Sequence, residues 1–275
     1  MPHAHDRAAA DLVEVSLPGG RLTAAQLQAL AELAHEHAGG ALVLTAGGLG
    51  LRGDRTELTA RLTGHGFDRP GEHRHRLLAS PLSGRIGGHV DVWETLAGVR
   101  DRLDGTAPDR DIVVGIDDGT GDIAALAPEV GALALPDGRW ALLLDGTDSG
   151  VRLPPGDVVE ALVAAAQRPR RAGVAATLTA LGLEPSEPAA HPPVPAPPVG
   201  WLDQPDGAVT LGGGLPGAVL PARMAEFLAA VDRPLVVTPW PVLLLCDLDE
   251  WVAEQVVRVL APMGLIFDAD SPALS

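Results

Sequence analysis

The chain has 275 residues, of which 46% are hydrophobic, enough to bury the core of one large domain or of two to three small ones. Its 36 acidic residues outnumber 20 basic ones, all of them arginine, and the net charge of −16 disfavours nucleic acid and anionic membranes as partners. The single cysteine, Cys246, excludes an internal disulfide, and without a long apolar run or an apolar N-terminal signal segment we expect a cytoplasmic protein.

The first predicted unit covers residues 11–68 and follows a polar stretch at 1–10 that we expect to be a flexible tail. Its opening strand has apolar residues at every second position, and Thr23 is the N-cap candidate of the helix that follows. A short apolar run between glycines then predicts a buried strand. The unit is predicted to contain, in order, a strand at 13–17, a helix at 22–38, a strand at 41–45, a further strand, and a closing helix at 58–67.

The same order of elements returns at residues 201–275, which suggests that one small unit was duplicated. Two copies so far apart indicate a pseudo-two-fold arrangement around an inserted domain rather than a solenoid. A sheet with helices on one face is expected for each copy, which gives an α+β fold. The matching positions are Val15/Val209, Leu17/Leu211, Thr45/Thr238 and Phe67/Phe267.

A different domain is predicted at residues 69–184, followed by a proline-rich, semi-rigid linker at 185–200. Its pattern mixes helices and strands. We predict helices at 90–103, 158–166 and 174–183, a strand at 111–117, a turn at 118–122 and a hairpin formed by 130–135 and 140–144.

Several short motifs have both a functional and a plain interpretation. The stretch 212–217 fits GxGxxG, with Asp232 as a possible ribose ligand, but a glycine-rich turn is favoured over a nucleotide loop. The carboxylates at 117–122 are interpreted as a hairpin turn, with calcium binding as the alternative. His35 and His37 point to different faces of one helix, and a metal site would need His65 and His75 to converge across a loop, so solvated histidines are favoured over metal binding.

Five motifs occur in an order that resembles precorrin-3B synthase, a member of the nitrite/sulfite reductase superfamily. They are Leu17–Leu22, Thr45–Gly53, Leu78–Gly84, Val113–Gly119 and Leu235–Trp240. The resemblance implies ferredoxin-like half-domains at 11–68 and 201–275, related by a pseudo-two-fold, and an α/β sirohaem-type middle domain at 69–184. It also implies a further domain whose cysteines hold a [4Fe-4S] cluster, where the reductases bind sirohaem as well.

The sequence departs from the family pattern at positions that would contact a cofactor. Gly47, His75 and Pro241 stand where the family has arginine, the side chain best suited to hold the carboxylates of a tetrapyrrole. The sequence given ends near Pro272, about where the cluster-bearing domain begins in the family. We therefore expect this chain alone to bind neither the [4Fe-4S] cluster nor sirohaem.

These observations predict a degenerate relative without the Fe-S domain, a non-catalytic binding or assembly protein linked to tetrapyrrole (cobalamin) or redox metabolism. The alternative is one part of a split oxidoreductase whose Fe-S/sirohaem domain is on a partner chain. A third hypothesis is a small-molecule binder that uses the glycine turn at 212–217. Sequence alone leaves enzymatic activity undecided, and we assign no catalytic or metal-binding residue. Residues predicted to contact a ligand, with a tetrapyrrole as the candidate, are Thr45, Arg52, Arg76, Ser80 and Arg85.

Overall fold

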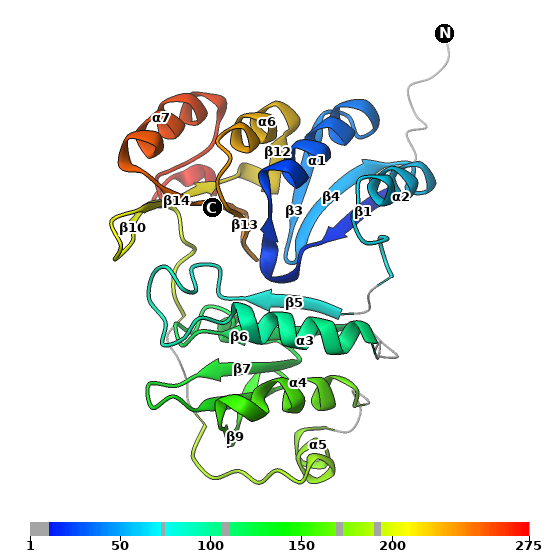
Figure 1. Cartoon of the computed structure of the whole chain (residues 1–275), viewed down its shortest axis with the longest axis vertical. Coiled ribbons are helices and arrows are strands. Elements are labelled where there is room, and N and C mark those ends of the chain that lie inside the picture. Colours follow the sequence, from blue (N-terminus) through cyan, green and yellow to red (C-terminus); the bar gives the residue numbers. More distant parts are fainter. Residues whose placement is uncertain (1–10, 73–74, 106–110, 169–172, 190–193, 275) are drawn as a thin grey trace.

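The computed structural model describes residues 11–72, 75–105, 111–168, 173–189 and 194–274, so the tail predicted at 1–10 lies outside the described residues. The fold is mixed α/β and contains three sheets. Two of them lie beneath a row of four helices, and the third lies on the side of these sheets away from that row (Figure 1).

The first sheet is antiparallel throughout and consists, in spatial order, of β1 (Asp11–Ser16), β4 (Gly48–Gly53), β3 (Ala41–Thr45) and β12 (Val219–Pro221). Helices α1 (Ala24–His37) and α2 (Arg55–Gly64) cover one face. Strand alternation divides the side chains between the two faces. The face beneath the helices buries Val13, Val15, Leu42, Leu44, Leu49 and Leu51, and the opposite face carries Leu12, Glu14, Val43, Thr45 and Arg52.

The predicted N-cap at Thr23 is confirmed as a capping box at the start of α1. The backbone N–H of Gln26 donates to Thr23 Oγ1 at 3.1 Å, and the N–H of Thr23 donates to Gln26 Oε1 at 2.8 Å. Leu27, Leu30 and Ala34 then form the buried stripe of the helix. The cap and this stripe together explain why the helix begins and lies where it does.

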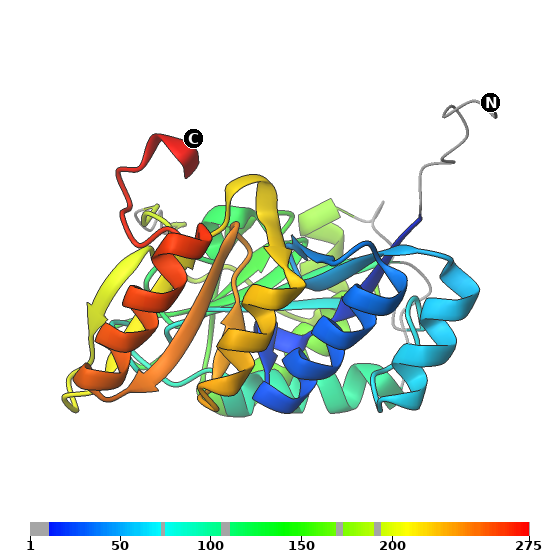
Figure 2. The same cartoon turned by 90° about the horizontal axis from the view of Figure 1, so that it is seen from above.

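The second sheet is also antiparallel and consists, in spatial order, of β10 (Gly200–Asp203), β11 (Val209–Gly214), β14 (Val242–Leu248), β13 (Leu235–Val237) and β2 (Arg21–Leu22). Helices α6 (Ala222–Ala230) and α7 (Glu250–Leu260) complete the row of helices. Figure 2 shows α7, α6, α1 and α2 side by side above the strands.

Each of these two sheets contains one short strand from the other half of the sequence. Leu22 of β2 pairs with Leu235 of β13, and Leu220 of β12 pairs with Leu42 of β3. Apart from these exchanged strands, the orders β1-β4-β3 and β11-β14-β13 correspond element by element. The exchange was not predicted from the sequence, because strands of two and three residues are too short for a periodic pattern.

One apolar core lies between the two sheets and the row of helices, and it includes residues from both halves of the chain. Helix α1 packs directly against α6. Leu27 and Leu30 of α1 and Leu228 of α6 are at most 2% exposed. A leucine buried to this degree contributes roughly 1.5–3 kcal/mol, so the two halves stabilise one another.

The third sheet is mixed and consists, in spatial order, of β5 (His75–Ala79), β6 (Ile112–Asp117), β7 (Val130–Ala134), β8 (Trp140–Leu144) and β9 (Thr147–Leu153). The first three strands are parallel and the last three antiparallel. Helices α3 (Trp93–Gly105), α4 (Val158–Ala166) and α5 (Gly173–Leu181) belong to the same part of the chain, and their apolar faces contribute to its core.

The predicted hairpin of β7 and β8 is confirmed, with Val130 paired to Leu144. The interpretation of residues 118–122 as a hairpin turn is wrong, because β6 and β7 run parallel and need a crossover connection. Strands β5 and β9 were not predicted as strands. The apolar residues of β5 follow a stretch rich in histidine and arginine, and β9 carries four polar or glycine residues at its start.

Part of the proline-rich stretch at 185–200 lies along the third sheet. The backbone N–H groups of Ser186 and Glu187 donate to the Gly150 carbonyl, at 2.9 and 3.2 Å, and Arg152 Nη2 donates to the Pro188 carbonyl at 2.9 Å.

Among the described ranges no helix combines the length and the apolar character that crossing a bilayer requires. Short 3-10 helices cover Pro18–Gly20, Ala124–Leu126, Pro155–Asp157, Pro216–Ala218, Ala261–Met263 and Pro272–Leu274.

Candidate functional site

Two of the predicted ligand-binding residues meet at a carboxylate that sequence reasoning did not single out. Arg76 Nη2, from β5, lies 3.1 Å from both Oε1 and Oε2 of Glu14 on β1. Thr45 Oγ1, at the end of β3, donates to Glu14 Oε1 at 2.7 Å. Glu14 is the polar residue between Val13 and Val15, so strand alternation turns it away from the core and toward the third sheet.

The side chain of Arg76 lies over Gly47, one of the three positions where the motif resemblance implies arginine. A Cβ at residue 47 would lie 2.6 Å from Arg76 Cδ and 2.7 Å from its Cγ, well inside van der Waals contact. An arginine at position 47 and the present conformation of Arg76 are therefore mutually exclusive. Arg76 fills the volume that a side chain at position 47 would need, and it points to Glu14.

Arg85 forms a second ion pair between the third sheet's loops and the second sheet. Its Nε and Nη2 donate to Oδ1 and Oδ2 of Asp247, each at 2.8 Å, and only 12% of the Arg85 side chain is exposed. Gln204 Nε2 also donates to Asp247 Oδ1 at 3.2 Å. These hydrogen bonds raise the pKa of Arg85, and the same guanidinium lowers the pKa of Asp247.

Ser80 is fully buried and binds the carboxylates that follow β6. Its hydroxyl donates to Asp122 Oδ1 at 2.6 Å and accepts the N–H of Asp118 at 3.0 Å. Burial first, and then the charge of Asp117, raises the pKa of Asp122 to about 7, and burial also raises the pKa of Asp118. The only proton of the Ser80 hydroxyl is thus already donated within the protein.

Oxygens of Asp117, Asp118 and Asp122 lie within 4.8 Å of one another. Asp117 accepts four backbone N–H groups at 2.8–2.9 Å, and these hydrogen bonds hold the loop in shape. The donors are Gly119, Gly121, Ile123 and Ala124. The three aspartates lie at the end of β6 and at the start of the connection from β6 to the parallel strand β7.

Arg52 does not join this group. It is exposed near the end of β4 and lies on the same sheet face as Glu14. Its partner on β1 is Leu12, two residues before Glu14. The structure therefore brings Thr45 and Arg76 together at Glu14 and places Arg85 at a second contact, with Asp247 of the second sheet. Ser80 binds within the third sheet's part of the chain, and Arg52 is separate from all of them. The sequence signal for Glu14 was its position in an alternating strand; Asp247 gave no such signal.

A hollow of about 740 Å³ remains beside the Glu14–Arg76 pair. Its charged lining consists of three carboxylates and two guanidinium groups, so it does not attract a ligand with many negative charges. These residues are Glu14, Asp111, Glu129, Arg55 and Arg76, and His75 adjoins them.

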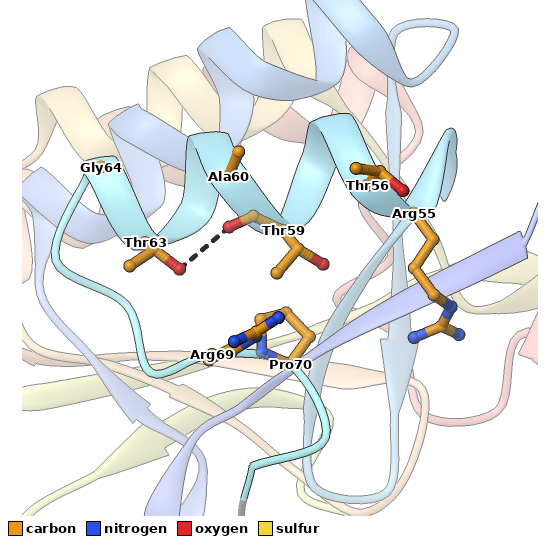
Figure 3. A pocket seen from close by; sticks show the side chains of 8 residues that line it. All are labelled: Arg55, Thr56, Thr59, Ala60, Thr63, Gly64, Arg69 and Pro70. Atoms are coloured by element: carbon orange, nitrogen blue, oxygen red, sulfur yellow. Dashed lines mark hydrogen bonds between the residues drawn. The ribbon is translucent and has the colours of Figure 1, made fainter.

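A second hollow, of about 670 Å³, lies on the outer side of α2 and shares Arg55 and Pro70 with the first. Figure 3 shows Thr59 and Thr63 directed from the helix toward Arg69 and Pro70. Its charged lining consists of Arg55 and Arg69, so it differs in electrostatics from its neighbour.

The second sheet meets the loops of the third through an apolar cluster. Val236, Val242, Leu244 and Cys246 are at most 2% exposed and pack with Leu82. On the first sheet, β4 has Gly48 and Gly50 on the face that carries Glu14 and Thr45, so it adds no side chain there. Apolar side chains therefore fill the part of the interface that the second sheet forms.

The residues present do not fit the cofactors that the resemblance implies. A [4Fe-4S] cluster needs several thiolates, and burial raises the pKa of the single thiol, Cys246, to about 11. Sirohaem would need unpaired cationic groups for its carboxylates, whereas Arg76 and Arg85 bind Glu14 and Asp247.

The glycine motif at 212–217 lies in and after β11, which is antiparallel to both of its neighbours. A Cβ at Gly212 would lie 1.8 Å from the Pro198 carbonyl oxygen, so this glycine allows a close approach of two backbones. A dinucleotide loop follows a strand of a parallel sheet, and the arrangement here differs.

Comparison with known proteins identifies relatives of this architecture. Residues 7–48 match the family described as "Nitrite/Sulfite reductase ferredoxin-like half domain". A comparison with curated proteins found no match. Among solved structures, the Mycobacterium tuberculosis NirA protein superposes with a TM-score of 0.75 at 18% identity, over 94% of this chain and 57% of NirA. Residues 7–48 thus resemble a nitrite/sulfite reductase ferredoxin-like half domain, and the fold of the chain is similar to that of NirA.

Proposed function

We propose that this chain is a nitrite/sulfite reductase-like protein without catalytic chemistry of its own, which acts as a binding or assembly protein linked to tetrapyrrole (cobalamin) or redox metabolism. One observation carries the proposal. The two best-placed arginines of the predicted ligand site, Arg76 and Arg85, are neutralised by Glu14 and Asp247 of the same chain. The metabolic link rests on the matched half domain and on the motifs that resemble precorrin-3B synthase.

An anionic ligand would have to displace these carboxylates before it could bind the guanidinium groups. Hydrogen bonds to charged groups contribute roughly 1.5–3 kcal/mol each. The free energy lost when Glu14 or Asp247 is displaced would therefore offset most of the free energy gained from the new hydrogen bonds to the ligand. The hollow beside Arg76 adds repulsion, because Asp111 and Glu129 also line it. The interface between the sheets is therefore suited to holding the protein together, and not to holding a polycarboxylate.

We further propose that residues 11–68 and 201–275 descend from one duplicated half-domain and are related by a pseudo-two-fold. The exchange of β2 and β12 between the first two sheets supports this relationship, since each copy gives the other the same element. The corresponding strand orders of the two sheets support it as well.

Iron and acid-labile sulfide analysis of the purified protein, together with its absorption spectrum, tests the proposal. We expect neither stoichiometric iron nor a haem-type absorption band, even after reconstitution with ferrous iron and sulfide under reducing conditions. A cluster or haem at one equivalent per chain would overturn the proposal, because the chain would then hold the group for which its residues are unsuited.

A split oxidoreductase is the second candidate, and exposed apolar side chains on the outer helices favour it. Trp251 of α7 is 70% exposed, and Val259 and Phe227 are 45% and 39% exposed. Aromatic side chains of this kind anchor protein interfaces. Purification from the native host should then recover a cysteine-rich partner that contains iron, and a Trp251→Ser variant should lose it. Recovery of the same partner by both forms would argue against this face as the contact.

A further inference from the structure

The residues that line the hollow on the outer side of α2 include two arginines and three threonines, and the proposed function gives Arg69 and these threonines no role. Successive turns of α2 and the segment that follows the helix line this hollow. Its volume of about 670 Å³ is that of a small-molecule site. The lining residues are Arg55, Thr56, Thr59, Ala60, Thr63, Gly64, Arg69 and Pro70.

The charge of this lining is opposite to that of the chain. Acidic residues outnumber basic ones by 36 to 20 in the whole sequence, yet the hollow is lined by two arginines and by no aspartate or glutamate among the described residues. Converging positive charge on an acidic protein raises the local concentration of anions at that place. The neighbouring hollow beside Arg76, with three carboxylates, does not have this property.

The lining side chains come from two segments that face the same space: Arg55 and the threonines from α2, and Arg69 from the segment that follows the helix. Arg55 begins α2 and reaches down from its start, with Nη2 3.4 Å from the Leu12 carbonyl oxygen, and Arg69 lies opposite the helix beside Pro70 (Figure 3). The Arg69 side chain forms neither an ion pair nor a hydrogen bond within the described part of the chain. Its guanidinium can therefore bind a ligand without first breaking an internal contact.

Hydroxyl groups provide the remaining polar contacts. Thr56, Thr59 and Thr63 lie on one side of α2, spaced by three and four residues. Thr63 Oγ1 donates to the Thr59 carbonyl at 2.9 Å, so its hydroxyl proton is already used. Thr56 and Thr59 retain theirs and can donate to an oxyanion.

We infer that this hollow binds a multiply charged oxyanion, a phosphate ester or a polycarboxylate, between the guanidinium groups of Arg55 and Arg69 with donation from Thr59. Guanidinium forks match both classes of anion, and two of them on opposite walls favour a ligand with at least two charged groups. The hollow shares only Arg55 and Pro70 with the hollow beside Arg76, and neither Arg69 nor Thr59 contacts the Arg76 or Arg85 ion pair, so variants at Arg69 and Thr59 test this inference separately from the proposed function.

Isothermal titration calorimetry with sodium pyrophosphate and, separately, with sodium citrate tests the inference at low ionic strength in a chloride buffer. The variants are Arg69→Gln, Thr59→Val and the matched control Arg61→Gln, which removes an exposed arginine of the same helix that does not line the hollow. Thermal unfolding of each variant verifies that it remains folded. Because Arg69 and Arg61 are both exposed, we expect little change in stability.

We expect saturable binding of at least one anion at one site per chain. Arg69→Gln should raise its Kd about tenfold or more, Thr59→Val by a smaller factor, and Arg61→Gln should leave it unchanged. Preference for pyrophosphate would identify a phosphate site, and preference for citrate a polycarboxylate site. The inference is overturned if neither anion binds saturably to the wild type, or if Arg61→Gln weakens binding as much as Arg69→Gln does.

Discussion

Arg85 and Asp247 are separated by 162 residues in the sequence, yet their side chains form two parallel hydrogen bonds of 2.8 Å each. This pair connects the loop after β5 with β14, and so joins the third sheet's part of the chain to the second sheet. Asp247 adopts a left-handed backbone conformation, with φ of 59°, which aspartate and asparagine tolerate better than most residues.

Replacement of Asp247 by asparagine should therefore lower the free energy of unfolding by about 1–3 kcal/mol, because it leaves the largely buried Arg85 without a counter-charge. Asparagine keeps the backbone conformation, so the loss measures the charge. Urea denaturation gives the value, and Asp206→Asn, on the exposed turn before β11, is the control. Equal stability of Asp247→Asn and the wild type would show that this ion pair contributes nothing net.

The raised pKa of Asp122 predicts an unusual dependence of stability on pH. The carboxyl group ionises near pH 4 in the unfolded chain but only near pH 7 in the folded protein. Between these values the folded state binds more protons, so the free energy of unfolding should fall as pH rises from about 4 to 7 and should level off above. Burial raises the pKa of Asp118 as well, which acts in the same direction.

An Asp122→Asn variant should lose most of this slope, since the amide stays neutral over the whole range and can still accept from the backbone N–H of Ile123. Denaturation curves at half-unit steps from pH 4 to pH 8 compare the two proteins. A parallel slope in the variant would mean that other groups, and not Asp122, set the dependence.

The contact between Gly47 and Arg76 predicts a non-additive pair of substitutions. Gly47→Ala places a Cβ 2.6 Å from Arg76 Cδ and should cost about 1–3 kcal/mol. In an Arg76→Ala background the same substitution should cost clearly less, because the obstructing side chain is gone. The difference is read from a double-mutant cycle. Gly64→Ala, with no atom within 4 Å of the added Cβ, is the control and should be close to neutral.

The exchanged strands predict that neither half-domain folds by itself. Leu220 is fully buried and pairs with Leu42 of the other half, so Leu220→Ala should cost about 2–5 kcal/mol, although it lies far from the first unit in sequence. A fragment of residues 11–68 should remain unfolded by circular dichroism and gain structure when a fragment of residues 201–274 is added. A stable isolated first fragment would contradict the shared core.

Local signals in the sequence predicted much of the fold. The capping box at Thr23, the alternating strand before it and the β7–β8 hairpin each depend on neighbours within a few residues. The exchange of β2 and β12 depends on pairing over most of the chain, which no local pattern records. The crossover after β6 was mistaken for a hairpin turn, because aspartates and glycines mark both kinds of connection.

The candidate site was predicted only in part, for a related reason. Motif resemblance selected Thr45, Arg76, Ser80 and Arg85. The structure places Arg76 and Arg85 at contacts of the third sheet's part of the chain with the first and second sheets, and Thr45 on the carboxylate that Arg76 binds. Ser80 instead binds Asp122 within the third sheet's part of the chain. Their partners were not predicted. A polar residue in an alternating strand faces either solvent or another layer, and the sequence does not distinguish the two for Glu14.

The measurement that tests the neutralised arginines most directly is a fluorescence titration with uroporphyrin, a porphyrin that carries carboxylates on every pyrrole ring. Every protein compared carries Arg69→Gln, which removes the anion site inferred beside α2, and on this background the otherwise wild-type chain should bind it weakly or not at all. Glu14→Gln, which removes the counter-charge of Arg76 and keeps an acceptor for Thr45, should bind it about tenfold more tightly. Glu32→Gln, on the exposed face of α1, should behave as the wild type. Tight, saturable binding by the wild type, unchanged by Glu14→Gln, would contradict the account.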